Sequence, residues 1–151
     1  MDFVGPDTVI SNLANAVYGA GPWLLGILQS RLHRTWAAAV GGRMKTDIRY
    51  SSILVYNTFP VPDLSDADKE RLSSGAMGVL AAREQFPHQT LADLYDPDKM
   101  PAALRGAHQE LDEIVDRIYR ARPFGSDAER LALLFEMYDQ AVSAELEQAR
   151  A

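Results

Sequence analysis

The sequence has 151 residues, is 47% hydrophobic and carries a net charge of -6, so it can bury the core of one domain, or of one domain and part of another. It contains no cysteine, which excludes disulfides and thiolate metal sites. The first residues, MDFVGPDTVI, lack the basic and apolar regions of a signal peptide, and no apolar run is long enough to span a bilayer. We therefore expect a cytoplasmic protein without a membrane partner.

Positive charge is concentrated in residues 31–50. This stretch holds five Arg or Lys side chains and one carboxylate, whereas residues 51–151 hold ten basic and eighteen acidic side chains. A polyanion would be attracted to the first stretch and repelled by the second. An ordinary solvated surface can have the same charge, so charge alone leaves both DNA binding and a plain polar face open.

The first predicted helix begins near Pro22 and ends at the glycine pair Gly41-Gly42. Proline is tolerated in the first helical turn, where its missing N–H costs little, and glycine commonly follows the last turn. Between these ends, apolar residues recur at helical spacing. They are Leu24, Leu25, Leu28, Leu32 and Trp36.

Residues 47–62, DIRYSSILVYNTFPVP, have a different pattern, which favours extended structure. The residues that favour a strand here are Ile53, Val55, Tyr56 and Phe59. Pro60 and Pro62 oppose a helix, and residues 14–18 are a second candidate strand. A segment this small cannot bury its strands alone, so we expect it to be the end of a larger domain.

Three further helices are predicted. The second begins after Ser65, whose hydroxyl can cap it, and runs to about Phe86. The third begins after Pro101. The fourth begins after Ser126, which is expected to form a reciprocal capping box with Glu129. The loop between the third and fourth helices is short, so these two are predicted to be antiparallel neighbours.

The third and fourth helices each carry an apolar stripe at a 3.6-residue period, which predicts their buried faces. In the third helix the stripe is Leu104, Ala107, Leu111, Ile114, Val115 and Ile118. In the fourth helix it is Leu131, Leu134, Phe135, Tyr138, Val142 and Leu146. Together the elements predict a mainly α fold (α+β). A short mixed α/β segment, residues 1–62, would precede a helical C-terminal domain with antiparallel helices, residues 63–151.

Nothing in the sequence predicts a catalytic centre. The three histidines, His33, His88 and His108, lack the spacing of metal ligands, and no phosphate-binding loop or nucleophile-elbow motif is present. Four carboxylates of the third helix are expected to form its solvated face, paired with Arg117 and Arg120. They are Glu110, Asp112, Glu113 and Asp116. We therefore predict no catalytic residue, metal ligand or cofactor-binding residue in this chain.

Aromatic residues near the basic stretch leave two roles open. Tyr50, Tyr56 and Phe59 could stack on bases or belong to the core, and the core is favoured. The same preference applies to Trp23 and Trp36.

Two long runs of the sequence resemble one family. LGILQSRLHRTWAAAVGGRMKTDIRYSSILVYNTFPVP resembles the end of the target-recognition domain of MmeI-like DNA methyltransferases, the type IIL restriction–modification enzymes. LADLYDPDKMPAALRGAHQELDEIVDRIYRARPFGSDAERLALLFEMYDQ resembles the helical C-terminal domain of the same family. The match covers nearly the whole chain and keeps several motifs in one order.

The resemblance implies a C-terminal fragment of a site-specific N6-adenine DNA methyltransferase. Its partners would be double-stranded DNA and the remainder of the methyltransferase chain, which would hold S-adenosylmethionine. The cofactor glycine motif and the [NSD]PP[YF] motif of such enzymes are missing here, so no cofactor is expected on this fragment and its own enzymatic activity is uncertain.

The resemblance also suggests which residues read DNA. It implies that Lys45 and Asp47 contact base edges, because lysine can donate to guanine O6 and N7 and aspartate can accept from cytosine N4. Arg34, Arg43 and Arg49 would then contact the DNA backbone. Alternatively, Lys45 and Asp47 are ordinary turn residues, and Asp47 pairs with Arg49. A separate alternative for the whole chain is a helical protein–protein interaction module.

Overall fold

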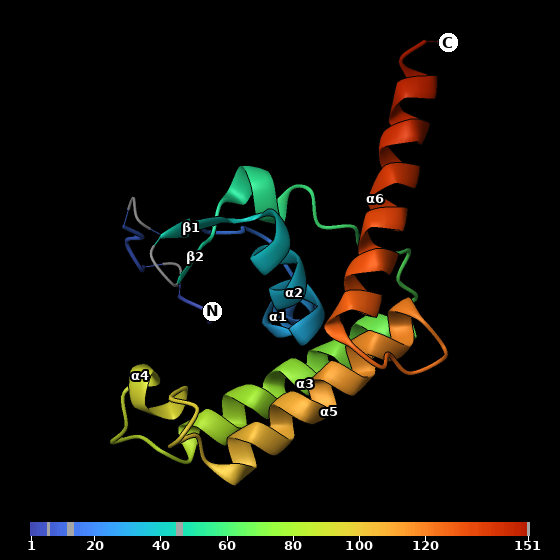
Figure 1. Ribbon diagram of the computed structural model, residues 1–151. Coiled ribbons are helices and arrows are strands. Elements are labelled where there is room, and N and C mark those ends of the chain that lie inside the picture. Colours follow the sequence, from blue (N-terminus) through green and yellow to red (C-terminus); the bar gives the residue numbers. More distant parts are fainter. Residues whose placement is uncertain (6, 12–13, 45–46, 151) are drawn as a thin grey trace.

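The computed structural model describes residues 1–5, 7–11, 14–44 and 47–150. Its elements are α1 (Pro22–Gln29), α2 (Arg31–Val40), β1 (Gly42–Met44), β2 (Asp47–Arg49), the π-helix η1 (Ser52–Tyr56), α3 (Asp66–Glu84), α4 (Leu91–Leu94), α5 (Ala102–Tyr119) and α6 (Asp127–Gln148). The fold is therefore mainly helical, as the sequence predicts (Figure 1). Among the described residues, no helix is both long and apolar enough to cross a membrane.

The predicted first helix is two helices that meet at Ser30. Ser30 has extended backbone angles, and its hydroxyl accepts a hydrogen bond from the His33 N–H at 3.2 Å and donates one to the Ile27 carbonyl at 2.7 Å. The side chain thus caps the start of α2 while it satisfies the end of α1. The apolar spacing runs through the break, which explains why the sequence predicts one continuous helix.

A short β-hairpin follows α2. β1 and β2 pair antiparallel, with Gly42 opposite Arg49, Arg43 opposite Ile48 and Met44 opposite Asp47. Residues 42–44 and 47–49 therefore form the extended part of this region. The ribbon stands beside α2 and away from the long helices α3 and α5 (Figure 1).

Two strand predictions are wrong. Residues 52–56 form η1, and residues 14–18 contain no strand. Ser51 caps η1 by accepting a hydrogen bond from the Leu54 N–H at 3.3 Å, and the Thr58 hydroxyl donates to the Leu54 carbonyl at 2.7 Å. These local bonds satisfy backbone groups that a strand would need a neighbour to satisfy. The β-propensity of Ile53 and Val55 is overridden in this way.

The long helices α3 and α5 lie side by side in antiparallel directions, and α1 crosses α3 (Figure 1). Gly26 of α1 allows this close crossing, because a Cβ at this position would lie 2.7 Å from the carbonyl oxygen of Leu72. One apolar cluster joins all five longer helices with Val55 and Phe59. Its fully buried members include Ile27, Leu32, Trp36, Leu72, Val79, Leu104, Leu111, Val115 and Leu134.

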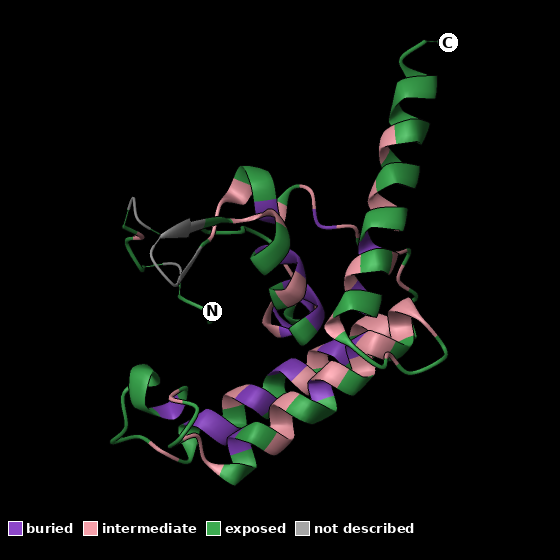
Figure 2. Cartoon of the chain, viewed as in Figure 1, coloured by how far each residue is buried: buried purple, intermediate pink, exposed green. Residues whose placement is uncertain are grey.

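Helix α6 packs against α2 and diverges from α5, so the prediction that the last two helices are antiparallel neighbours is wrong (Figure 1). The Trp36 ring explains this direction, because it lies 5.1 Å from the Phe135 ring and 5.9 Å from the Tyr138 ring, between centroids. The C-terminal half of α6 is largely exposed (Figure 2). Leu146, predicted to be buried, is 53% exposed.

The two predicted caps of the longer helices differ in outcome. Ser65 caps α3 as predicted, and Asp68 completes a reciprocal capping box with it. At α6 only half of the predicted box is present. The Ser126 hydroxyl accepts from the Glu129 N–H at 3.2 Å, but the Glu129 carboxylate accepts from the Gly125 N–H and from Arg120 instead.

Candidate nucleic-acid interface

The hairpin holds most of the residues predicted to contact DNA. Arg43 belongs to β1, and Asp47 and Arg49 belong to β2. Arg49 is exposed. Lys45 falls between the two strands and lies outside the described residues. Asp47 and Arg49 are the first and last residues of β2.

The base of the hairpin is attached to α2 through aromatic and polar contacts. The Tyr50 hydroxyl lies 3.0 Å from Nε2 of His33, which is buried in α2. The Phe59 ring packs edge-on against the His33 ring, with centroids 4.6 Å apart. The Trp36 indole N–H donates to the Thr58 hydroxyl at 3.2 Å. Tyr50 and Phe59 are therefore structural contacts, as the sequence favours.

The exit from this region is also held by α5. The Tyr119 hydroxyl donates a hydrogen bond of 2.9 Å to the carbonyl oxygen of Pro60. Burial raises the pKa of Tyr119, so its hydroxyl stays protonated and remains a donor. The base of the hairpin and the segment after η1 are therefore attached to α2 and to the end of α5.

Arg34 lies on another side of α2 from the hairpin contacts. It is exposed, and it is one helical turn along from Arg31. Its positive charge contributes to lowering the pKa of Asp127 in α6 and of His108 in α5, in both cases as a smaller cause. Arg34 is therefore close enough to α5 and α6 to affect charged groups there, and it belongs to a different element from Arg43 and Arg49.

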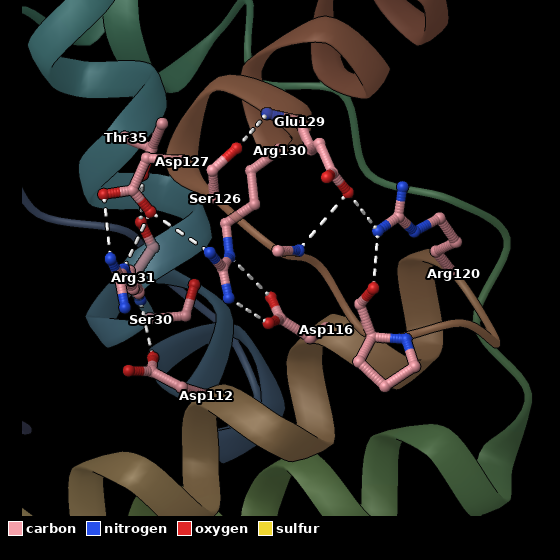
Figure 3. Close-up of polar contacts among 12 residues, drawn as sticks. Ser30, Arg31, Thr35, Asp112, Asp116, Arg120, Ser126, Asp127, Glu129 and Arg130 are labelled. Carbon is pink, nitrogen blue, oxygen red and sulfur yellow. Dashed lines mark hydrogen bonds and ion pairs between the residues drawn. The ribbon is translucent and has the colours of Figure 1, made fainter.

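A cluster of charged residues joins the start of α2 to α5 and α6 (Figure 3). We call it the polar joint. It consists of Arg31, Asp112, Asp116, Asp127 and Arg130.

The Asp112 carboxylate accepts a hydrogen bond of 2.6 Å from the backbone N–H of Arg31. Arg31 donates from Nε and Nη2 to the two carboxylate oxygens of Asp127, at 2.7 and 3.1 Å. Arg130 donates to Asp127 at 3.1 Å and makes a two-pronged contact with Asp116. One carboxylate thus bridges two arginines from different helices.

The electrostatics of the polar joint differ between its carboxyl groups. The hydrogen bond from Arg31 holds the pKa of Asp127 below its usual range. Burial raises the pKa of Asp112, although the Arg31 N–H opposes that rise. The hydrogen bonds to Asp116 raise the pKa of Arg130. The Asp116–Arg130 pair is the most buried, with 15% and 8% of the side chains exposed.

Comparison with known proteins assigns both halves of the chain. Residues 1–63 match the family model "MmeI, target recognition domain", and residues 64–146 match "MmeI, C-terminal domain". The chain belongs to the MmeI family. The predicted resemblance is confirmed.

Two known proteins align with most of the chain. The chain is 49% identical over 140 residues to DNA methyltransferase A of Bacillus subtilis (strain 168). This alignment covers 93% of the chain and 16% of that protein. The chain superimposes with a TM-score of 0.79 and 40% identity on the type IIL restriction–modification enzyme MmeI, solved in complex with DNA, over 83% of the chain and 17% of that structure. The chain thus spans about a sixth of the length of either relative.

The polar joint lies between the two parts that match the MmeI models, and it was not predicted. Asp112 and Asp116 were expected to be on a solvated face, but they contact Arg31 and Arg130 instead. The same prediction holds for Glu113, which pairs with Arg117 at 3.6 Å. Arg31 and Asp112 are 81 residues apart in the sequence, so helical periodicity could not indicate their contact.

Proposed function

We propose that this chain supplies DNA target recognition to an N6-adenine DNA methyltransferase of a restriction–modification system. Residues 1–62 would be the C-terminal part of the recognition domain, and residues 63–151 the helical domain that braces it. Catalysis and the binding of S-adenosylmethionine would belong to the remainder of the methyltransferase polypeptide. The relatives that support this proposal are a DNA methyltransferase and a type IIL enzyme solved with DNA.

The observation that carries the proposal is the β1–β2 ribbon. The major groove of B-DNA admits a two-stranded ribbon, and the edges of its base pairs present distinct donors and acceptors there. Asp47 begins β2, and Lys45 falls between the strands. A cation and an anion two residues apart fit the two partners of a G·C pair, with Lys45 donating to guanine and Asp47 accepting from cytosine.

The arginines have a separate role in this proposal. Arg43, Arg49 and Arg34 would contact DNA phosphates, which positions the protein without reading sequence. Arg43 and Arg49 flank the proposed reading pair in the hairpin. Arg34 lies near the start of α2, whereas the hairpin follows the end of that helix. Arg34 would therefore contact a different stretch of the DNA backbone.

Exchange of the two charges tests base reading. In a methyltransferase that contains this chain, Lys45→Glu with Asp47→Arg should reverse the donor and the acceptor at one base pair. The methylated site should change at one position, with about 1–3 kcal/mol of discrimination moved between bases. Methylation sequencing of genomic DNA measures the site.

The matched control exchanges an exposed pair in the helical part. Glu113→Arg with Arg117→Glu reverses charges that are 71% and 73% exposed, and it leaves the net charge unchanged. This control should retain the original site. An unchanged site in the Lys45–Asp47 variant would show that these residues do not read DNA.

A second candidate function is a protein–protein interaction module. Ile53 and Leu54 of η1 are 71% and 54% exposed, and Val61 is 44% exposed. A groove of about 440 Å³ lies between residues 57–61 and α6. Of these three residues Val61 lines the groove, and exposed apolar residues of this kind fit a protein partner. The salt dependence of binding separates this candidate from DNA recognition.

A further inference from the structure

The polar joint holds the start of α2, and the hairpin follows the other end of that helix. Arg31 is the first residue of α2, and α2 leads through Gly41 into the hairpin. Ten helical residues and a three-residue strand extend roughly 25 Å. A rotation of about 10° at the start of α2 would therefore displace the end of the ribbon by about 4 Å, whereas hydrogen bonds tolerate only a few tenths of an ångström.

Aromatic packing brings α2 and α6 together. Trp36 packs on Phe135 and Tyr138 of α6, but such ring pairs occur over a range of centroid distances and interplanar angles. The polar joint restricts the orientation of α2 relative to α5 and α6. The planar guanidinium of Arg31 meets both oxygens of Asp127, a two-pronged geometry that restricts relative orientation. Asp112 holds the backbone N–H at the start of the same helix.

The composition of the polar joint balances its charge. Three carboxylates meet two guanidinium groups, which leaves one negative charge in excess. The start of α2 offsets it, because helix N-termini carry a partial positive charge and free N–H groups. Asp112 bonds to one of these N–H groups at 2.6 Å. The start of α2 thus contributes positive charge to the polar joint. A rotation or shift of α2 would break the hydrogen bond between the Arg31 N–H and Asp112.

We propose that Arg31 and Asp127 are positioning residues for DNA recognition, which act by fixing the direction of α2 and of the hairpin against α5 and α6. This inference rests on the proposed function, because it assigns the joint to the control of the same ribbon. The two side chains are nearly half exposed, at 46% and 45%, so their pair adds little to folding stability. Their effect is on the orientation of α2, and it extends to the hairpin, which they do not contact.

A distance measurement tests the joint without DNA. The chain contains no cysteine, so spin labels can be placed at Ala39→Cys in α2 and Gln109→Cys in α5, two exposed positions. The labelled chain should give a narrow distance distribution. Arg31→Met and Asp127→Asn should broaden or shift it. Arg31→Lys should do the same, because lysine keeps the charge but lacks the two-pronged geometry.

The control for these variants is Arg117→Met. It removes an arginine from an exposed ion pair within α5 that is not part of the polar joint, and it should leave the distribution unchanged. If Arg31→Met and Asp127→Asn also leave the distance distribution unchanged, the positioning role is refuted. The same conclusion follows if they lower the melting temperature but leave the distance distribution unchanged.

Selection from a randomised DNA duplex library gives the functional readout. The unmodified chain should enrich one motif, and Arg31→Met should reduce its preference for that motif about tenfold with an unchanged salt dependence. Equal preference in the two proteins would refute the role in recognition. If the unmodified chain enriches no motif, the proposed function fails, whereas the distance measurement still decides whether the joint sets the direction of α2.

Discussion

His33 is a buried imidazole at the base of the hairpin, with only 2% of its surface exposed. Burial lowers its pKa to about 4, from an ordinary value of 6.5. The ring is therefore neutral at pH 7, which suits its contacts with the Tyr50 hydroxyl and the edge of Phe59. Protonation would place a charge among aromatic rings without a described carboxylate beside it.

This lowered pKa predicts how stability depends on pH. Between pH 6.5 and about 4 the unfolded chain binds a proton at His33 and the folded chain does not. The free energy of unfolding should therefore fall as the pH falls through this window, by up to about 1.4 kcal/mol per pH unit from this group. Urea unfolding at pH 7, 6 and 5 measures the slope.

His108 has to be controlled in that experiment, because burial also lowers its pKa and acts in the same direction. His33→Gln should flatten the pH slope more than His108→Gln does, since His33 is the more deeply buried of the two. A slope that is the same with and without His33 would contradict the prediction.

At the scale of elements, the crossing of α1 over α3 depends on one glycine. Gly26→Ala would place a Cβ 2.7 Å from the Leu72 carbonyl oxygen, and a backbone atom cannot move aside cheaply. We expect this variant to be about 1–3 kcal/mol less stable, despite the higher helix propensity of alanine. Urea unfolding at one pH measures the difference.

Gly78 of α3 is the matched control. It is exposed, and a Cβ there would meet nothing within 4 Å. Gly78→Ala should therefore stabilise the chain by about 0.5–1 kcal/mol, through helix propensity alone. Similar effects of the two substitutions would mean that the α1–α3 crossing is looser than described.

The elements that the sequence predicts well are those with a local signal. The apolar stripe of α5 predicts the buried Leu104, Leu111 and Val115, and Ser65 marks the start of α3. The break at Ser30 is harder to predict, because part of its support comes from Asp112, far along the sequence. η1 is missed because bonds of Ser51 and Thr58 to the backbone override residue propensity.

The same distinction applies to the candidate site. The basic stretch and the glycine pair are visible in the sequence, and the family resemblance supplies the roles of Lys45 and Asp47. The joint that would orient them is not visible, because it combines α2 with residues of α5 and α6. The direction of α6 is missed for a similar reason, because it depends on the packing of Trp36 in α2 against Phe135 and Tyr138, which are distant in the sequence.

At the scale of the whole molecule, charge is divided between a basic hairpin region and an acidic helical part. If the chain binds duplex DNA through three to four basic side chains, log K should fall with log salt with a slope of about -3 to -4. Arg49→Ala should reduce that slope by about 1 and weaken all sequences alike. Fluorescence anisotropy with a labelled duplex measures both.

Arg117→Ala serves as the control for the salt titration and should leave the slope unchanged, because Arg117 lies on α5 in a separate ion pair. Binding that is insensitive to salt, or absent even at low salt, would count against DNA contact. Binding of a protein partner through Ile53, Leu54 and Val61 would instead persist as salt rises.

The open hairpin has a consequence for solubility. Within the described residues β1 and β2 pair only with each other. Each strand therefore has an outer edge whose backbone groups are not hydrogen-bonded to another described strand. Such edges favour aggregation, because they can pair with the same edge of another molecule. Arg43 places a positive charge on β1, so two copies that approach through their β1 edges repel each other, whereas β2 carries both Asp47 and Arg49. The charge that attracts DNA therefore also keeps copies of the chain apart, and variants with a neutral hairpin should precipitate at lower concentration.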